Sequence, residues 1–243
     1  TYKNTKIGTY VDYTLMVAEY TDAVSGKEVY DKLGKTAMDK YDVATKVDGN
    51  TDAEILKHIN KNNKDDLTGT GTGVLTQVFV NDDEKEAAVV EINTYLGIAN
   101  GDYSAKKDEA TFIVYGLSEV KKDVYEKFNA KTHGKKDTSR FDVSGEDFDV
   151  SKVEDEDAYL FTVAAGEVQT CVPAETLKDS EITSFKIGSN VTVAGTKYEF
   201  NDAAYYDAKA LTVYTGEDKN TVVNLKDTTY NVYLDTYGNL IGL

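Results

Sequence analysis

Residues 74–92 read Val74-Leu-Thr-Gln-Val-Phe-Val80, Asn81-Asp-Asp-Glu-Lys-Glu86 and Ala87-Ala-Val-Val-Glu-Ile92, which is two apolar runs separated by an acidic polar turn. Apolar, β-branched runs bounded by polar turn residues are typical of a β-hairpin. The pattern recurs at Ala158–Val163 with Val168–Val172, around Gly166, and at Tyr230–Leu234 with Leu240–Leu243, around Gly238. The chain therefore reads as a β-rich scaffold built by repeating hairpins.

Further strands are expected throughout the chain. They are residues 7–20, Asn93–Ile98, Ala110–Tyr115, Ile182–Ile187, Val191–Val193, Thr196–Phe200, Leu211–Tyr214 and Thr221–Leu225. The strands of the second half form a meander with short polar turns, and five or more strands on a curved sheet close best as a small barrel or sandwich.

Two short helices are expected in the first half. Ser25-Gly-Lys-Glu28 has the spacing of a capping box, ahead of Val29, Tyr30 and Leu33 on one helical face. Residues 52–62 form the clearer helix: Asp52 is placed to cap it, and Ile55, Leu56 and Ile59 share a face.

These elements predict a β-rich α+β protein of two consecutive modules, residues 1–116 and 117–243. Each module is expected to be an antiparallel sheet or a small β-barrel or sandwich, with the short helices mainly in the first. A length of 243 residues is enough for one large domain or two modules of roughly 100–130 residues.

The formal charge of −16, from 43 acidic and 27 basic residues, repels nucleic-acid phosphates and anionic membranes. We therefore expect neither nucleic acid nor a membrane among the partners. No apolar run approaches the roughly 18 residues that a spanning helix needs. The chain starts at Thr1 without a signal peptide, which suggests a fragment or a processed product.

Cys171 is the single cysteine, so an intramolecular disulfide and a Cys-based zinc site are both excluded. It lies in an apolar strand, where a buried and inert thiol is expected. His58 and His133, the two histidines, stand outside any recognisable triad or His-Glu-x-x-His motif. We predict no catalytic residues and no cofactor-binding residues; a hydrolase that uses paired carboxylates stays a lesser alternative.

Calcium is the one metal that the sequence leaves open. Asp48-Gly-Asn50-Thr-Asp52 matches the first positions of an EF-hand loop, but Ala53 replaces its glycine and Ile59 its final glutamate. Two acidic clusters, residues 142–149 and 154–157, leave weak calcium binding as an alternative to solvated turns. The metal ligands are therefore undetermined, and no other cofactor is expected.

Two further compositional features have structural explanations. The segment Thr68-Gly-Thr-Gly-Thr-Gly73 lacks the Walker spacing and precedes a strand, so we interpret it as a linker or hinge. The tyrosines of the second half suit either ordinary sheet packing or a sugar-binding strip. They are Tyr205, Tyr206, Tyr214, Tyr230, Tyr233 and Tyr237.

Three stretches resemble the repeat modules of cell-surface proteins that contain S-layer homology domains, from Gram-positive-type anaerobes. They are residues 228–242 (ending Tyr233-Leu-Asp-Thr-Tyr-Gly-Asn-Leu-Ile-Gly242), residues 157–170 with 191–198, and residues 89–97 after 73–80. The resemblance implies export and attachment to the cell wall through S-layer homology repeats, which this sequence does not contain. It carries no functional residues.

The resulting hypothesis is a non-catalytic extracellular module, a stalk or scaffold, of a bacterial S-layer-type surface protein. Its expected partners are cell-wall or surface-layer components, carbohydrate among them. The alternative is a carbohydrate- or ligand-binding module that uses exposed tyrosines and acidic loops.

Overall fold

The computed structural model describes residues 15–33, 42–47, 50–51, 53–81, 86–115, 138–164, 167–186, 189–205 and 229–243. The chain folds as two compact units. The first contains residues 1–93 and 162–169, and the second contains residues 94–161 and 170–243.

The module boundary predicted at about residue 116 lies outside the described residues. The strands on its two sides are β7 (Glu109–Tyr115) and β8 (Thr138–Ser144), and they pair antiparallel along their full length within the second unit. The compact units divide after Asn93, and residues 162–169 group with the first of them.

The first unit is a five-stranded sheet in the order β1-β4-β5-β2-β3. Its strands are β1 (Leu15–Tyr20), β2 (Asp42–Val47), β3 (Asn50–Thr51), β4 (Leu75–Asn81) and β5 (Glu86–Ile92). β4 and β5 form the hairpin expected from residues 74–92. Leu75 pairs with Ile92 at one end of the hairpin, and Asn81 pairs with Glu86 at the other. β2 runs parallel to β5, and the other pairs are antiparallel.

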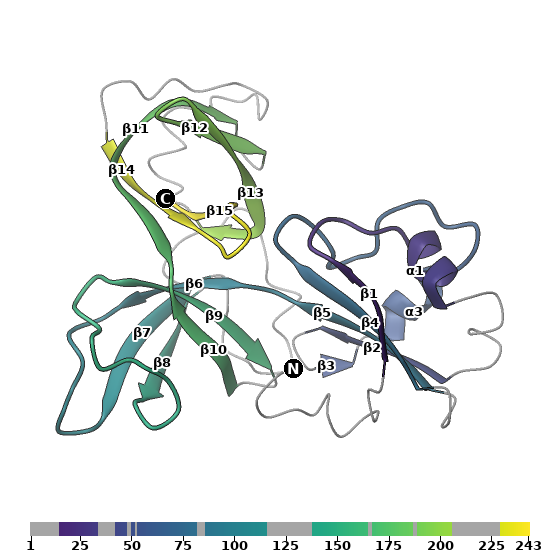
Figure 1. Cartoon of the computed structure of the whole chain (residues 1–243), viewed down its shortest axis with the longest axis horizontal. Helices are drawn as coiled ribbons and strands as arrows, with labels where there is room; N and C mark the ends of the chain where they lie inside the picture. The colour runs from purple at the N-terminus through teal and green to yellow at the C-terminus, as the bar shows by residue number, and fades with distance from the viewer. Residues whose placement is uncertain are drawn as a thin grey trace. The chain divides into compact units, whose positions relative to one another are not determined.

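Two helices, α1 (Gly26–Leu33) and α3 (Ala53–His58), lie on the same side of this sheet (Figure 1). They join the strands in one buried apolar cluster, which includes Val24, Val29, Leu33, Ile55, Ile59, Val78 and Val89. The predicted capping box is present: the Ser25 amide donates to Glu28 Oε2 at 2.9 Å, and the Glu28 amide donates to Ser25 Oγ at 3.3 Å. Asp52, the predicted cap of the second helix, lies outside the described residues.

A second sheet has the order β10-β9-β6-β7-β8 (Figure 1), and most of its residues belong to the second unit. Its remaining strands are β6 (Tyr95–Ala99), β9 (Ala158–Ala164) and β10 (Glu167–Pro173). Phe112 is fully buried, with its ring centroid 5.1 Å from that of Tyr159 and 5.0 Å from that of Phe161. A Cβ atom on Gly97 would lie 2.4 Å from Phe161 Cε2, so this aromatic cluster requires glycine on β6.

The rest of the second unit is a closed barrel in the order β11-β12-β13-β15-β14 (Figure 1). Its strands are β11 (Glu175–Lys186), β12 (Asn190–Val193), β13 (Thr196–Tyr205), β14 (Thr229–Leu234) and β15 (Leu240–Gly242). β11 pairs with β14 through its first half and with β12 through its second half. The parallel pairing of β13 with β15 closes the barrel. This strand order is the topology of an OB-fold.

The predicted fold class is confirmed: the protein is β-rich α+β, with antiparallel sheets, a small five-stranded barrel and few short helices. The sequence did not predict β2, β8 or the first half of β11. β11 starts at Glu175, and its residues 175–181 are mainly polar, with no buried position among them. They form a strand because β14 offers an edge for backbone hydrogen bonds. The side-chain pattern of these residues does not indicate this pairing.

Candidate functional site

The turn between β14 and β15 contains the most complete polar site in the described residues. Asp235 is 3% exposed. Its Oδ1 accepts hydrogen bonds from the amides of Tyr237 (2.8 Å) and Asn239 (2.9 Å). Its Oδ2 accepts from Asn201 Nδ2 (2.8 Å) and Asn239 Nδ2 (3.2 Å).

These four bonds use the acceptor capacity of the carboxylate, which offers about four lone-pair positions. Asn201 lies on β13 and is 2% exposed. Its Oδ1 accepts a hydrogen bond from the amide of Ala203 at 2.8 Å. Gly238 has φ of +82°, which favours glycine at the tip of the turn. The Asp235 site therefore fixes the turn to the barrel and keeps no free oxygen for a ligand.

The acidic loops of the second unit are organised in the same way. Gly101 N–H donates to Asp155 Oδ1 at 2.7 Å, and Asp155 N–H donates to Asp102 Oδ1 at 2.9 Å. The amide of Glu154 donates to Asp157 Oδ2 at 3.0 Å. Carboxylates of the 154–157 cluster therefore hold loop backbone.

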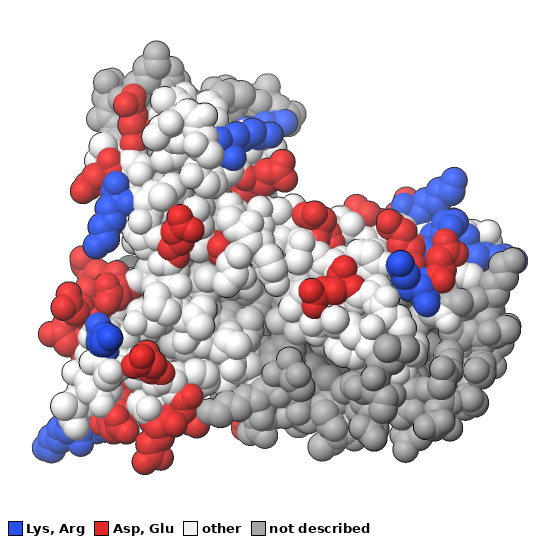
Figure 2. Space-filling view, viewed as in Figure 1, with Lys and Arg blue, Asp and Glu red and all other residues white. Residues whose placement is uncertain are grey.

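Metal ligation by these clusters stays an alternative. In the stretches that the structure describes, no group of three or more His, Cys, Asp or Glu side chains is arranged to hold a metal ion. Asp48 and Asp52, the ends of the partial EF-hand match, lie outside those stretches. Asp and Glu cover more of the face shown in Figure 2 than Lys and Arg do.

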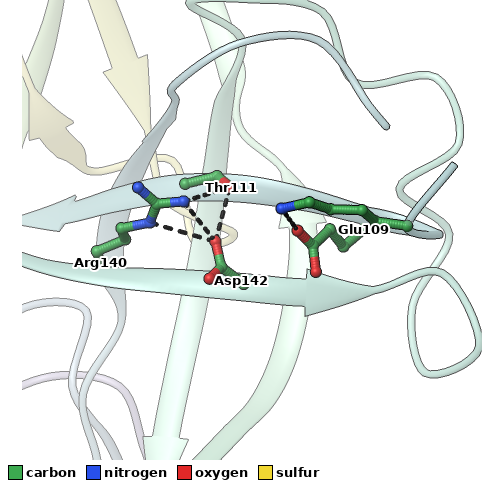
Figure 3. Close-up of polar contacts among 5 residues, drawn as sticks. Glu109, Thr111, Arg140 and Asp142 are labelled. Carbon is green, nitrogen blue, oxygen red and sulfur yellow. Dashed lines mark hydrogen bonds and ion pairs between the residues drawn. The ribbon is translucent and has the colours of Figure 1, made fainter. Parts of the chain in front are cut away.

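Arg140, the only arginine in the chain, lies on β8 in a small exposed network (Figure 3). Its Nη2 lies 3.1 Å from Asp142 Oδ1 and 3.3 Å from Thr111 Oγ1, while Thr111 Oγ1 donates to Asp142 Oδ1 at 2.7 Å. The Thr111 hydrogen bond, followed by Arg140, lowers the pKa of Asp142. Beside it, Lys107 Nζ and Glu109 Oε1 form an ion pair at 2.8 Å. Exposed pairs of this kind orient strand side chains and contribute little stability.

The nucleophile and acid–base candidates lie apart from these networks. Cys171, on β10, is 7% exposed, and burial raises the pKa of its thiol to about 12. The thiolate needed for nucleophilic attack is therefore scarce at neutral pH. His58 is exposed at the end of α3, where its carbonyl accepts a hydrogen bond from Asn63 Nδ2 at 2.8 Å. His133 lies outside the described residues.

The interpretation of residues 68–73 as a linker or hinge is wrong. Gly71 and Gly73 are buried, and Thr70 is 8% exposed. Thr70 Oγ1 accepts the amide of Val24 at 3.3 Å and donates to the Leu67 carbonyl at 2.8 Å. Small residues allow this segment to pack closely against the chain before α1, which polarity and glycine content alone do not reveal.

The tyrosines of the barrel divide between packing and exposure. Tyr230 packs against the barrel core, and Tyr233 packs against the cluster of Leu96, Leu160 and Ile241. Tyr237 is 43% exposed at the β14–β15 turn. Tyr206, Tyr214 and the side chain of Tyr205 lie outside the description, so the described residues present one exposed ring of this set.

A second buried polar group was not anticipated from the sequence. Tyr20, Thr76 and Glu91 are direct cross-strand neighbours on β1, β4 and β5. Thr76 is fully buried, and Glu91 is 1% exposed. The available signal was Glu91 itself, a charged residue between the apolar Val90 and Ile92.

Comparisons with protein-family models, with curated proteins and with solved structures find no match to this chain. No helix in the described part of the chain is both long and apolar enough to cross a membrane.

Proposed function

We propose that this chain is a non-catalytic extracellular module, a stalk or scaffold, of a bacterial S-layer-type cell-surface protein. The observation that carries the proposal is that the hydrogen bonds of the Asp235 carboxylate are all made within the protein. In the stretch that resembles the ends of surface-protein repeats, the Asp235 carboxylate is buried and fully occupied by hydrogen bonds within the barrel.

The packing of the two units supports a mechanical role. The helix-covered sheet has its own apolar cluster around Val29, Ile55 and Val89, and the barrel has another around Phe185, Phe200 and Leu240. Modules that bury separate cores can be joined in series and act as spacers, since each folds against its own residues.

Surface location is tested by protease shaving. Intact cells of the source organism would be treated with immobilised trypsin, and the released peptides identified by mass spectrometry. Peptides of this chain should appear together with known wall proteins and before any cytosolic marker. Their appearance only after lysis would contradict the proposal. Sequencing the reading frame on both sides adds an independent test, because a secretory signal and S-layer homology repeats are expected there.

Ligand binding is the second candidate, favoured by the barrel topology and by Tyr237. OB-folds bind oligosaccharides and oligonucleotides on their second and third strands and on the turn between the fourth and fifth. The corresponding strands here are β12 and β13. Where these two strands pair, the described outward side chains are Asn190, Thr192, Lys197 and Glu199, and none of these four is aromatic. Tyr237 on the β14–β15 turn is the exposed ring at such a position.

The two candidates are separated by a binding measurement. Purified cell-wall polysaccharide would be titrated into the wild-type chain and into Tyr237→Ala, with Thr236→Ala, also exposed on the turn, as the matched control. A loss of affinity confined to Tyr237→Ala would favour the binding module. Equal affinities of the three proteins for the polysaccharide would leave the scaffold proposal as the better account.

A further inference from the structure

The first unit contains three oxygen-bearing side chains in a row at one end of its sheet. Tyr20 on β1 is registered with Thr76 on β4, and Thr76 is registered with Glu91 on β5. Directly paired residues on neighbouring strands have Cβ atoms about 4.5–5.5 Å apart and project from the same face. We call these residues the Tyr20–Thr76–Glu91 row.

The row faces the helix-covered core. Thr76 and Val78 are two residues apart on β4 and project from the same face, and so do Glu91 and Val89 on β5. Both valines are fully buried in the cluster that α1 and α3 cover. Polar oxygen atoms at these positions are therefore shielded from bulk water.

Two hydroxyl groups of the row have unused hydrogen-bonding capacity. Among the residues that the structure describes, neither Thr76 Oγ1 nor Tyr20 Oη has a hydrogen-bond partner, and both atoms are buried. A buried hydroxyl left unsatisfied is energetically costly, so such groups in native proteins usually face a bound water or ion. Burial, and next the nearby Glu28 carboxylate, raise the pKa of Tyr20, so its phenol stays neutral at physiological pH.

The segment 67–73 covers the row. A Cβ atom on Gly69 would lie 2.5 Å from Glu91 Oε2, so the backbone of the segment approaches the carboxylate as only glycine allows, and Gly69 has φ of +89°. The Gly73 amide donates to the Thr21 carbonyl at 2.8 Å, which ties the segment to the residue after Tyr20.

We propose that the Tyr20–Thr76–Glu91 row is an internal binding site for a monovalent cation such as Na⁺ or K⁺. One carboxylate and two hydroxyl oxygens form a hard ligand set without nitrogen or sulfur, which suits alkali and alkaline-earth ions. The set contains one carboxylate, whereas Ca²⁺ sites usually combine several, so it favours a monovalent ion. The bound ion would join three strands beneath the 67–73 segment.

Thermal unfolding in different salts tests the site. The midpoint of the full chain would be measured in sodium, potassium and choline chloride at equal ionic strength, for the wild type and for Thr76→Val. We expect a higher midpoint in sodium or potassium than in choline for the wild type, and no such difference for Thr76→Val. In choline, Thr76→Val should be at least as stable as the wild type, because it removes a buried hydroxyl that lacks a partner.

Thr70→Val is the matched control. Thr70 lies in the covering segment, and its hydroxyl already has two protein partners. This variant should unfold at a lower midpoint in all three salts and should keep the difference between them. Tyr20→Phe and Glu91→Gln should both lose the difference; if Glu91→Gln fails to fold, Tyr20→Phe and Thr76→Val still decide the outcome.

Thallium(I) gives a direct readout. Crystals soaked in a thallium(I) salt should show an anomalous peak next to Thr76 Oγ1. Equal midpoints of the wild type in the three salts, together with the absence of that peak, would overturn the proposal and assign the row to ordered water. A salt response that Thr76→Val retains would overturn it as well, since the ion would then bind elsewhere.

Discussion

Asn201 Nδ2 lies 2.8 Å from Asp235 Oδ2, and both side chains are almost completely buried. This hydrogen bond links β13 to the turn that follows β14, beside the parallel closure of β13 and β15. A buried carboxylate that accepts several hydrogen bonds is costly to disrupt, because its removal leaves several donors without partners.

Replacing Asp235 by alanine should therefore lower the free energy of unfolding of the second unit by about 3 kcal/mol, from the loss of charged hydrogen bonds and the exposure of unpaired donors. Urea unfolding monitored by tyrosine fluorescence measures the change. Thr236→Ala, exposed on the same turn, should stay within about 0.5 kcal/mol of the wild type. Similar values for the two variants would show that Asp235 does not hold the turn.

Gly97→Ala should destabilise the β6–β9 region by about 1–3 kcal/mol, because the added methyl group would overlap the Phe161 ring. The same denaturant experiment applies. In the double variant Gly97→Ala/Phe161→Leu, the loss should be smaller than the sum of the two single losses, since the smaller side chain makes room. Additive losses would mean that the ring is not the obstacle.

Ser25→Ala should cost about 1 kcal/mol at neutral pH, because it removes the N-cap of α1. Hydrogen bonds from Ser25 lower the pKa of Glu28 below its ordinary value of 4.5. The stabilisation from Glu28 is thus present above that value and is lost as the pH falls through the lower folded-state pKa. Unfolding measured across acidic pH should show a weaker pH dependence for Ser25→Ala than for the wild type, with Ser25→Thr close to the wild type.

Cys171 should react slowly with a thiol reagent in the folded protein at mildly alkaline pH, because the thiol is buried and its pKa is raised to about 12. Full labelling is expected in denaturing urea, where the pKa returns to its ordinary value of 9.0. Rapid stoichiometric labelling without denaturant would show that β10 opens readily.

Arg140→Ala should change the free energy of unfolding by less than about 1 kcal/mol, because the Arg140–Asp142 pair is exposed. The Thr111 hydrogen bond is the larger cause of the lowered Asp142 pKa. An NMR titration of the Asp142 carboxyl group should therefore show a greater rise of the pKa in Thr111→Val than in Arg140→Ala. The reverse order would assign the effect to the guanidinium group.

Much of the fold was predictable because hairpins and caps are local. The runs at 74–92 predicted the β4–β5 pair, and Ser25 with Glu28 predicted the start of α1. The parallel strand β2 and the polar half of β11 escaped prediction, because each depends on a partner strand distant in the sequence. Residues 68–73 looked like a linker because glycine content is shared by flexible linkers and by tightly packed segments.

The sequence by itself determined the β-rich composition, the acidic surface, the central hairpins and the burial of Cys171. Only the tertiary structure decided that Asn201 meets Asp235, and that Tyr20, Thr76 and Glu91 form one row. Alternation along a strand indicates which side chains point inward, but strand order and register determine which of them become neighbours. Those are set by the packing of the whole sheet, so polar groups far apart in the chain meet only when the fold is complete.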